Sequence, residues 1–330
     1  LMNTIAPAYL MSDTLFALLI LKMVQLSLQR GSSPYAAHAY NTYGILIISM
    51  NSKNVAQALE FGETALELQR RETPPELLCK MLFYYGTFYA HWKHPYRKSH
   101  AHLKRAFRAG LQTGDLQYAG YSLGGRCCAS FMSGENLEDV RKRTDGFVRF
   151  ILRTDNYEPF GMLSATRQWC RNLMGLTPDR DAFYDEHFTR EELERNLVSS
   201  NSASIRFLYG MTRAQTLFLY GDYEAAARAL EGPGRDITAA IAMPHGTDYY
   251  FYAGLIAAAG FEARGVHGRR LRDALQRFKI WAEVCPRNFR ARYLLLRAEH
   301  HRVRKDHMAA AKDYSSALGE AIEQHTTQIA

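Results

Sequence analysis

Helix start signals recur along this chain at the spacing of short helices, and they constrain its fold more than any other feature. Ser33-Pro34 and Thr73-Pro74 each offer a hydroxyl N-cap followed by proline at the first helical position. Thr73 with Glu76, and Thr189 with Glu192, have the capping-box spacing. Because few segments alternate as strands do, these signals favour an all-α fold.

Apolar residues spaced at 3.6 positions between these signals predict the individual helices. A lead helix is expected near 12–30, with about seven helix pairs after it and an inserted loop near 176–187. Gly31 and Gly110 are expected to end helices. The expected pairs are 34–50 with 53–72, 76–92 with 96–110, 115–132 with 136–153, 158–174 with 189–199, 202–220 with 222–231, 246–262 with 267–284, and 288–304 with 306–323.

Small residues twelve positions apart suggest that these pairs are repeats of the tetratricopeptide kind. In such repeats a small residue on each helix lets the two axes approach closely. The matching pairs are Gly44 with Ala56, Ala214 with Ala226, and Ala298 with Ala310. Since a single pair cannot bury its apolar face alone, stacked neighbours build the core. The predicted fold is one α-α superhelix over 1–330, a curved rod with a concave binding face.

The lead helix is apolar around nearly its whole circumference and therefore needs cover on two sides. The following pair can supply one side, and an element missing before residue 1 would supply the other. The first residue is leucine rather than methionine. We therefore expect the chain to be a fragment of a larger protein.

The five cysteines are an odd number without CxxC spacing, which favours reduced thiols packed as small apolar residues in a cytoplasmic protein. No signal-peptide pattern is seen. The apolar run 15–21 is far shorter than the ~20 residues that span a bilayer. A protein without a membrane span is expected.

The net charge of +8 is concentrated in the C-terminal third, where residues 264–305 hold thirteen Lys and Arg against three acids. A solvated face is the leading interpretation, followed by an acidic protein or neighbouring domain and then by nucleic acid. No known nucleic-acid motif accompanies the cations. The residues proposed for a basic partner-binding face are Arg269, Arg270, Arg272, Arg290, Arg292 and Arg297.

One short motif resembles catalytic machinery. Residues 120–124 read G-x-S-x-G, the nucleophile elbow of α/β-hydrolases, with Ser122 at the nucleophile position. The elbow requires a buried strand leading into the turn, whereas residues 113–119 look like a polar helix start. A serine hydrolase using Ser122 is therefore only a remote alternative, and small residues at a close helix crossing explain the motif better.

Two histidine groups and several aromatic clusters are candidate binding sites. The first group is His91, His94, His100 and His102, and the second is His300, His301 and His307. Neither has a carboxylate or cysteine that would complete a metal-ligand set, so solvated or helix-end histidines are expected. The aromatics at 84–89 and 249–252 have helical spacing and are predicted to be core. No Walker A loop, G-x-G-x-x-G or kinase motif is present.

The run Ala109–Tyr121, which reads AGLQTGDLQYAGY, resembles a recurring stretch in a family of very large signalling proteins. Those proteins combine a serine/threonine-kinase-like domain, a predicted AAA-type ATPase, a long helical-repeat region, a GAF domain and often a sensor histidine kinase. Further resemblances cover roughly 1–323. They are Tyr40-x2-Tyr43-Gly44, Phe61-Gly62 with Ala65-Leu66, His91-Trp92, Phe131-x2-Gly134-x2-Leu137, Gln168 with Asn172-Leu173 and Gly175, Leu219–Tyr223, and Tyr250–Tyr252.

The resemblance implies a non-catalytic scaffold or sensing region between the ATPase and the sensor modules. Its partners would be neighbouring ATPase, kinase and sensor domains, and ATP would be bound only by those other domains. A free-standing tetratricopeptide adaptor, whose basic face captures acidic tails, is the alternative. No catalytic, cofactor or metal residues are carried over from the family.

Overall fold

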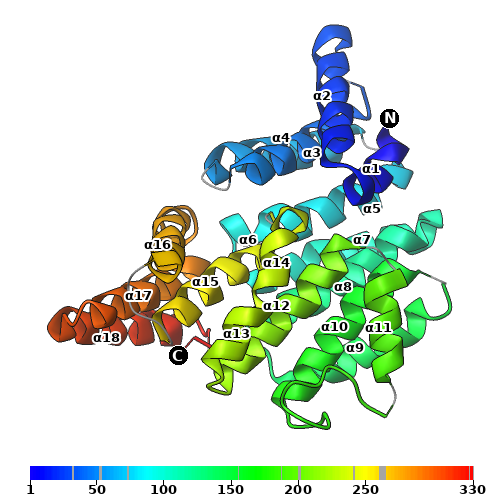
Figure 1. Cartoon of the computed structure of the whole chain (residues 1–330). Coiled ribbons are helices and arrows are strands. Elements are labelled where there is room, and N and C mark those ends of the chain that lie inside the picture. Colours follow the sequence, from blue (N-terminus) through cyan, green and yellow to red (C-terminus); the bar gives the residue numbers. More distant parts are fainter. Residues whose placement is uncertain are drawn as a thin grey trace.

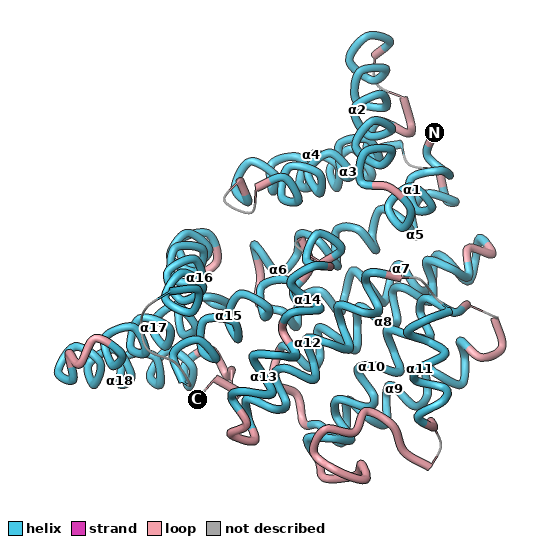
Figure 2. The backbone as a smooth tube through the Cα atoms, viewed as in Figure 1, coloured by secondary structure: helices cyan, strands magenta, loops and turns pink. Residues whose placement is uncertain are grey.

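The computed structural model describes residues 1–31, 33–51, 54–72, 74–154, 156–186, 188–199, 202–240, 242–259, 265–326 and 328–329. Apart from one isolated β-bridge between Asp185 and Phe188, the regular elements in these ranges are helices (Figures 1 and 2). The α-helices are α1 (Ile5–Met11), α2 (Asp13–Arg30), α3 (Ala36–Met50), α4 (Val55–Glu72), α5 (Pro75–Tyr84), α6 (Ala90–Lys93), α7 (Ser99–Thr113), α8 (Leu116–Met132), α9 (Leu137–Ile151), α10 (Tyr157–Leu173), α11 (Arg190–Ser199), α12 (Ala203–Leu219), α13 (Tyr223–Ala229), α14 (Glu231–Arg235), α15 (Pro244–Ala259), α16 (Gly265–Val284), α17 (Pro286–Val303) and α18 (His307–Glu323).

Successive helices pack largely as antiparallel pairs, which confirms the all-α prediction. The closest neighbours in space are α3 with α4, α7 with α8, α9 with α10, α15 with α16, and α17 with α18. The lead helix and the other predicted helices are found within a few residues of their expected bounds. The pairing differs in the middle of the chain, where α8 packs more closely on α7 than on its predicted partner α9, and α9 packs mainly on α10. The longest connection, between α10 and α11, is the predicted insert (Figure 2).

The capping signals have mixed outcomes. Thr189 and Glu192 form the full capping box, since the Thr189 amide donates to Glu192 Oε2 (2.8 Å) and the Glu192 amide donates to Thr189 Oγ1 (3.2 Å). Gly31 follows α2 with φ +83°, as expected. Thr73 lies outside the described residues. The prediction for Gly110 is wrong, because α7 continues to Thr113 and the left-handed cap is Gly114.

Gly110 instead lies at a crossing of three helices. A Cβ added there would come within 2.9 Å of Cys79 Sγ in α5 and of the Ala119 Cβ in α8. Only a residue without a side chain permits this approach. The small residue therefore marks close packing inside α7 rather than the end of the helix.

The expected small-residue crossings are partly as predicted. Ala214 and Ala226 are fully buried, and Ala298 and Ala310 are buried where α17 crosses α18. Ala56, in contrast, is exposed. A Cβ on Gly44 would come within 2.8 Å of the Ala58 carbonyl oxygen. The α3–α4 crossing thus uses Ala58, two positions beyond the predicted partner.

The helix over 75–93 contains one π-helical turn, Tyr85–Tyr89, between α5 and α6. The Tyr89 hydroxyl donates to the backbone carbonyl of Asn41 in α3. The Tyr85 hydroxyl donates to Glu63 in α4. The wide turn accommodates an extra residue, and it places both hydroxyls against the preceding helix pair.

The array curls back so that distant segments meet (Figure 1). Asn288 Nδ2 in α17 donates to the carbonyls of His91 (2.6 Å) and His94 (2.8 Å). Trp92 and Trp281 are in contact, with ring centroids 5.4 Å apart. Helix α16 also contacts α4. The curling buries most of the aromatics at 84–89 and 249–252 in one large core, so the array is not an extended rod.

Helix α1, which the sequence did not predict, covers part of α2. Ile5 and Ala8 of α1 are buried against Phe16, Ile20 and Met23 of α2. The outward side of α2 remains apolar and exposed over Leu15, Leu18, Leu21 and Leu28. Among the described residues, no helix is both long and apolar enough to cross a membrane.

Candidate functional site

The curled array surrounds an apolar cavity of about 80 Å³ that continues into open solvent. Its walls come from α1, α2, α3, α5, α8, α10, α12 and α15, together with the 3-10 turn η4 (Ile237–Ala239) and the residues that follow it. Helix α1 closes one side, where the Tyr9 hydroxyl donates to the Ala239 carbonyl at 2.5 Å.

Aromatic rings form much of the pocket wall. Phe83, Tyr84 and Tyr118 are buried and pack edge to face, and the hydroxyls of Tyr84 and Tyr118 are hydrogen-bonded at 2.6 Å. Phe88 and Phe207 complete this part of the wall. Such rings offer a large apolar surface together with negative π-faces that attract cations.

Four polar side chains of the wall lie close together and form what we call the polar end, although the cavity surface is almost wholly apolar. These are Glu158, Tyr9, Tyr121 and Ser204. The Ser202 hydroxyl donates to Glu158 Oε1 at 2.5 Å. Burial raises the pKa of the Glu158 carboxyl, and the hydrogen bond from Ser202 partly opposes this. Burial also raises the pKa of Tyr121 to about 12, with a smaller contribution from the charge of Glu158.

No lysine or arginine lines the pocket among the residues that the structure describes. Lys80 contacts the Tyr118 ring at 5.3 Å but is paired with Asp115 (3.6 Å) and does not line the cavity. His245 does line it. Burial lowers the pKa of His245 to about 4, so this ring is neutral at pH 7. Glu158 is thus the one charged side chain in the described wall.

The residues proposed for a basic face lie on two helices, α16 and α17. Arg269 and Arg272 are exposed on α16, and Arg270 beside them is half-buried. Arg290 is exposed on α17 and forms an ion pair with Glu320 at 2.9 Å. Arg297 makes a bidentate pair with Asp313, with both distances 2.6 Å. The structure therefore keeps these five at or near the surface, but two of them are already paired.

Arg292 does not belong to that face, contrary to the sequence-based expectation. Its side chain is 4% exposed and its guanidinium forms an ion pair with Asp248, which is equally buried. The rings of Phe251 and Tyr96 lie 5.3 and 5.8 Å from the guanidinium. Burial raises the pKa of the Asp248 carboxyl, while the charge of Arg292 opposes that rise. The pair is an internal contact between α15 and α17.

Ser122 occupies the middle of α8 and is fully buried. Its hydroxyl donates to the Tyr118 carbonyl one turn earlier, at 2.7 Å. Gly120 approaches Pro159 of α10, where a Cβ would come within 2.8 Å of the ring. These contacts match the helix-crossing interpretation. They lack the strand-to-helix turn that exposes the nucleophile of a hydrolase.

The histidines of the first group serve different contacts. His91 is fully buried beside Tyr96, against the expectation of a solvated residue. His100 lies 3.4 Å from Glu135, and His102 packs on Tyr85. In the described parts of the chain no three His, Cys, Asp or Glu side chains come together to hold a metal. The five cysteines are buried and free.

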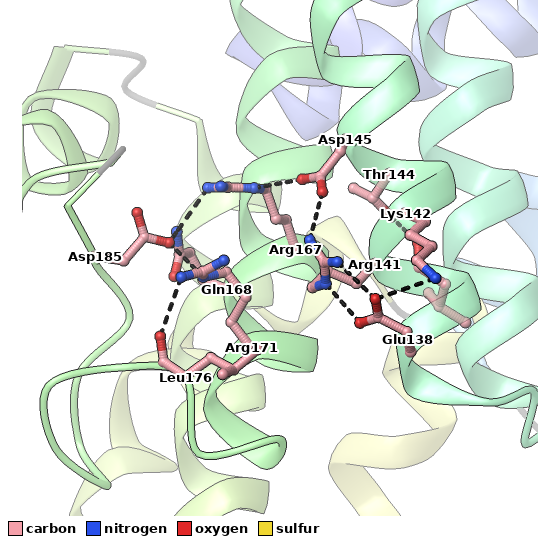
Figure 3. A network of polar contacts seen from close by, with 11 residues as sticks. Glu138, Arg141, Lys142, Thr144, Asp145, Arg167, Gln168, Arg171, Leu176 and Asp185 are labelled. Atoms are coloured by element: carbon pink, nitrogen blue, oxygen red, sulfur yellow. Dashed lines mark hydrogen bonds and ion pairs between the residues drawn. The ribbon is translucent and has the colours of Figure 1, made fainter.

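A polar network joins the insert to the helices beneath it (Figure 3). Asp185, on the insert, is buried and contacts Arg171 (2.6 Å), Arg167 (3.4 Å) and Gln168 (2.9 Å) of α10. Arg167 reaches Asp145 of α9 at 2.7 Å, and Asp145 continues to Arg141. Asn172 Nδ2 donates to the Ala182 carbonyl at 2.9 Å. The network fixes the loop in place.

The sequence did not single out the pocket residues as a site. Tyr84 and Phe88 were assigned to the core, and both do pack in it while also lining the cavity. Glu158 had no motif around it. Its isolation among apolar positions on α10 was the available signal, since a carboxylate on an inward helix face demands a partner. No protein-family model matches this chain, and no curated protein does.

Proposed function

We propose that this chain is a non-catalytic helical-repeat sensing region of a cytoplasmic multidomain ATPase-kinase, and that its helix pairs form a tetratricopeptide-like α-α superhelix. The exposed apolar side of α2 carries the proposal. Leu15, Leu18 and Leu21 are exposed one turn apart, and Leu28 follows beyond the exposed Gln25. A neighbouring domain would cover this apolar side. The sequence resemblance to the large signalling proteins supplies the identity of those neighbours.

The arrangement of the array supports a sensing role as well as a scaffold role. Helix α1 contacts α2 and also bonds to η4, which lies 230 positions away. A ligand bound between α1 and η4 would change the position of α1 and α2 relative to the other helices. Because α2 carries the proposed interdomain contact, that change would reach the neighbouring domain.

Two tests decide this proposal: the domains encoded in the full reading frame, and the kinase activity of the whole protein. We expect ATPase and kinase domains to flank the chain. Leu18→Glu and Leu21→Glu together should alter autophosphorylation of the whole protein, because they place charges in the proposed contact. Glu224→Gln, an exposed change on α13, is the control. A reading frame without either flanking domain, or kinase output unchanged by the double variant, would refute the proposal.

A free-standing adaptor with a basic face is the second candidate, favoured by exposed Arg269 and Arg272 on α16. Binding of an acidic peptide should then weaken with salt and fall in the Arg269→Gln, Arg272→Gln double variant. Binding of DNA is measured across the same salt series. If the partner is a nucleic acid, the DNA affinity should fall steeply as the salt concentration rises, because the contacts are made to phosphates. For the remote hydrolase alternative, ester hydrolysis that disappears in Ser122→Ala would revive it.

A further inference from the structure

We propose that the pocket binds an organic ammonium compound, with an aromatic or aliphatic body among the tyrosine and phenylalanine rings and a protonated amine beside Glu158. The inference adds a ligand class to the sensing role proposed above. It concerns the chain alone, so it can succeed or fail independently of the flanking domains.

Charge complementarity selects an amine over other ligands. Glu158 is the one charged side chain in the described wall, and its protein hydrogen bond comes from the neutral Ser202 hydroxyl. Among the described residues this half-buried carboxylate has no cationic partner, which leaves acceptor capacity for an incoming ammonium group. An anionic ligand would meet that carboxylate with no lysine or arginine in the described wall to offset it.

The position of Glu158 suits a ligand with one charged end. It lies at the polar end together with Tyr9, Tyr121 and Ser204, whereas the remaining wall is apolar and aromatic apart from Thr42 and His245. Hydroxyl oxygens at this end can accept further hydrogen bonds from an ammonium group. The rings of Tyr84 and Tyr118 then face the apolar body, and their π-faces tolerate positive charge.

The test uses three compounds of one shape and different charge: 4-phenylbutylamine, 4-phenylbutan-1-ol and 4-phenylbutanoate. Their affinities are measured on the intact chain by titration calorimetry at pH 7. We expect the amine to bind more tightly than the alcohol by about tenfold, and the acid to bind more weakly than the alcohol. Equal affinity for all three, preference for the acid, or no binding of the amine would overturn the proposal.

Two variants locate the site. Glu158→Gln should reduce the affinity of the amine by about tenfold and leave that of the alcohol unchanged, because only the charge is removed. Ser204→Leu, which fills the polar end, should weaken both compounds. Glu224→Gln on the surface should change neither. Thermal melting verifies that each variant is folded, and amine binding that survives Glu158→Gln would overturn the assignment even if the pocket is occupied.

Discussion

The Tyr9 hydroxyl donates a hydrogen bond to the backbone carbonyl of Ala239, which stands 230 positions later in the chain. This bond joins the first α-helix to η4 and closes the pocket on the side of α1. Tyr9→Phe removes it and leaves the ring in place. Because the Ala239 carbonyl then loses a partner, we expect the free energy of unfolding to fall by about 1 kcal/mol.

The same variant should act locally. Hydrogen exchange of the α1 amides is the sensitive measurement, since segments held by few contacts open before the core does. We expect faster exchange in α1 with unchanged protection in α17. Tyr35→Phe, at an exposed ring, is the control. Unchanged exchange in α1 would mean that apolar contacts alone hold that helix.

Arg292 and Asp248 form a buried ion pair, so breaking it should be costly. Arg292→Met leaves the Asp248 carboxylate without its cation, and the expected loss is about 3–5 kcal/mol by urea unfolding. Arg290→Met, which removes an exposed arginine paired with Glu320, should cost less than about 1 kcal/mol. Adding Asp248→Asn to Arg292→Met should recover part of the loss, and a purely additive result would contradict the coupling.

Asp185 should control the stability of the insert. Asp185→Asn removes the charge that Arg167 and Arg171 share, so the 176–186 segment should open more often. We expect trypsin to cleave at Arg180, which is exposed on the insert, at least several-fold faster than in the parent chain. Asp181→Asn is the matched control because Asp181 pairs with Arg213 at the surface. Equal cleavage in both variants would contradict the anchoring role.

Stability should fall as the pH drops below neutral. Burial lowers the pKa of His38 and of His91 to about 3 and that of His245 to about 4. Below pH 6.5 these histidines are protonated in the unfolded chain but stay neutral in the folded chain. Each ring therefore lowers the free energy of unfolding, by about 2 kcal/mol at pH 5. The effect grows down to the folded pKa values and is absent above pH 7.

His91→Phe isolates the contribution of one ring to this pH dependence. The slope of unfolding free energy against pH between 6 and 4.5 should decrease by about one proton equivalent, roughly 1.4 kcal/mol per pH unit. His307→Asn, at an exposed residue on α18, serves as the reference variant. An unchanged slope in His91→Phe would show that this ring titrates normally.

The α17–α18 crossing gives a direct packing test. Ala310→Leu adds bulk at a buried position of α18, which packs against α17, and the expected cost is about 1–3 kcal/mol. Ala311→Leu makes the same change one position along, on the exposed side of the helix, and should be nearly neutral. Similar melting temperatures for the two variants would refute the assigned register.

Local signals predicted the helices well because capping and periodicity are properties of neighbouring residues. The box formed by Thr189 and Glu192 was recognisable from a spacing of three positions. Gly110 was misjudged because a helix crossing and a helix end both call for glycine. The partner of Gly44 was shifted from Ala56 to Ala58, since the register between helices depends on how neighbouring side chains interlock.

Long-range contacts could not be predicted from the same signals. Arg292 looked like its exposed neighbour Arg290, and only the position of Asp248 on α15 explains its burial. The pocket likewise forms from eight α-helices and η4, which come together only because the array curls. Sequence patterns indicate which residues of a helix face inward, but they leave open which distant helix those residues meet.

The π-helical turn at Tyr85–Tyr89 sets the directions in which the side chains before and after it point. Upstream of it, Tyr84 faces the pocket; downstream, Trp92 stacks on Phe289 with centroids 5.1 Å apart. If these five residues were wound as a regular α-helix instead, everything after them would be rotated by about 100° relative to Tyr84. Trp92 would then point away from α17, and the ring of helices could not close. A single additional residue in one turn thus acts as the spacer that lets the chain's last quarter meet its first.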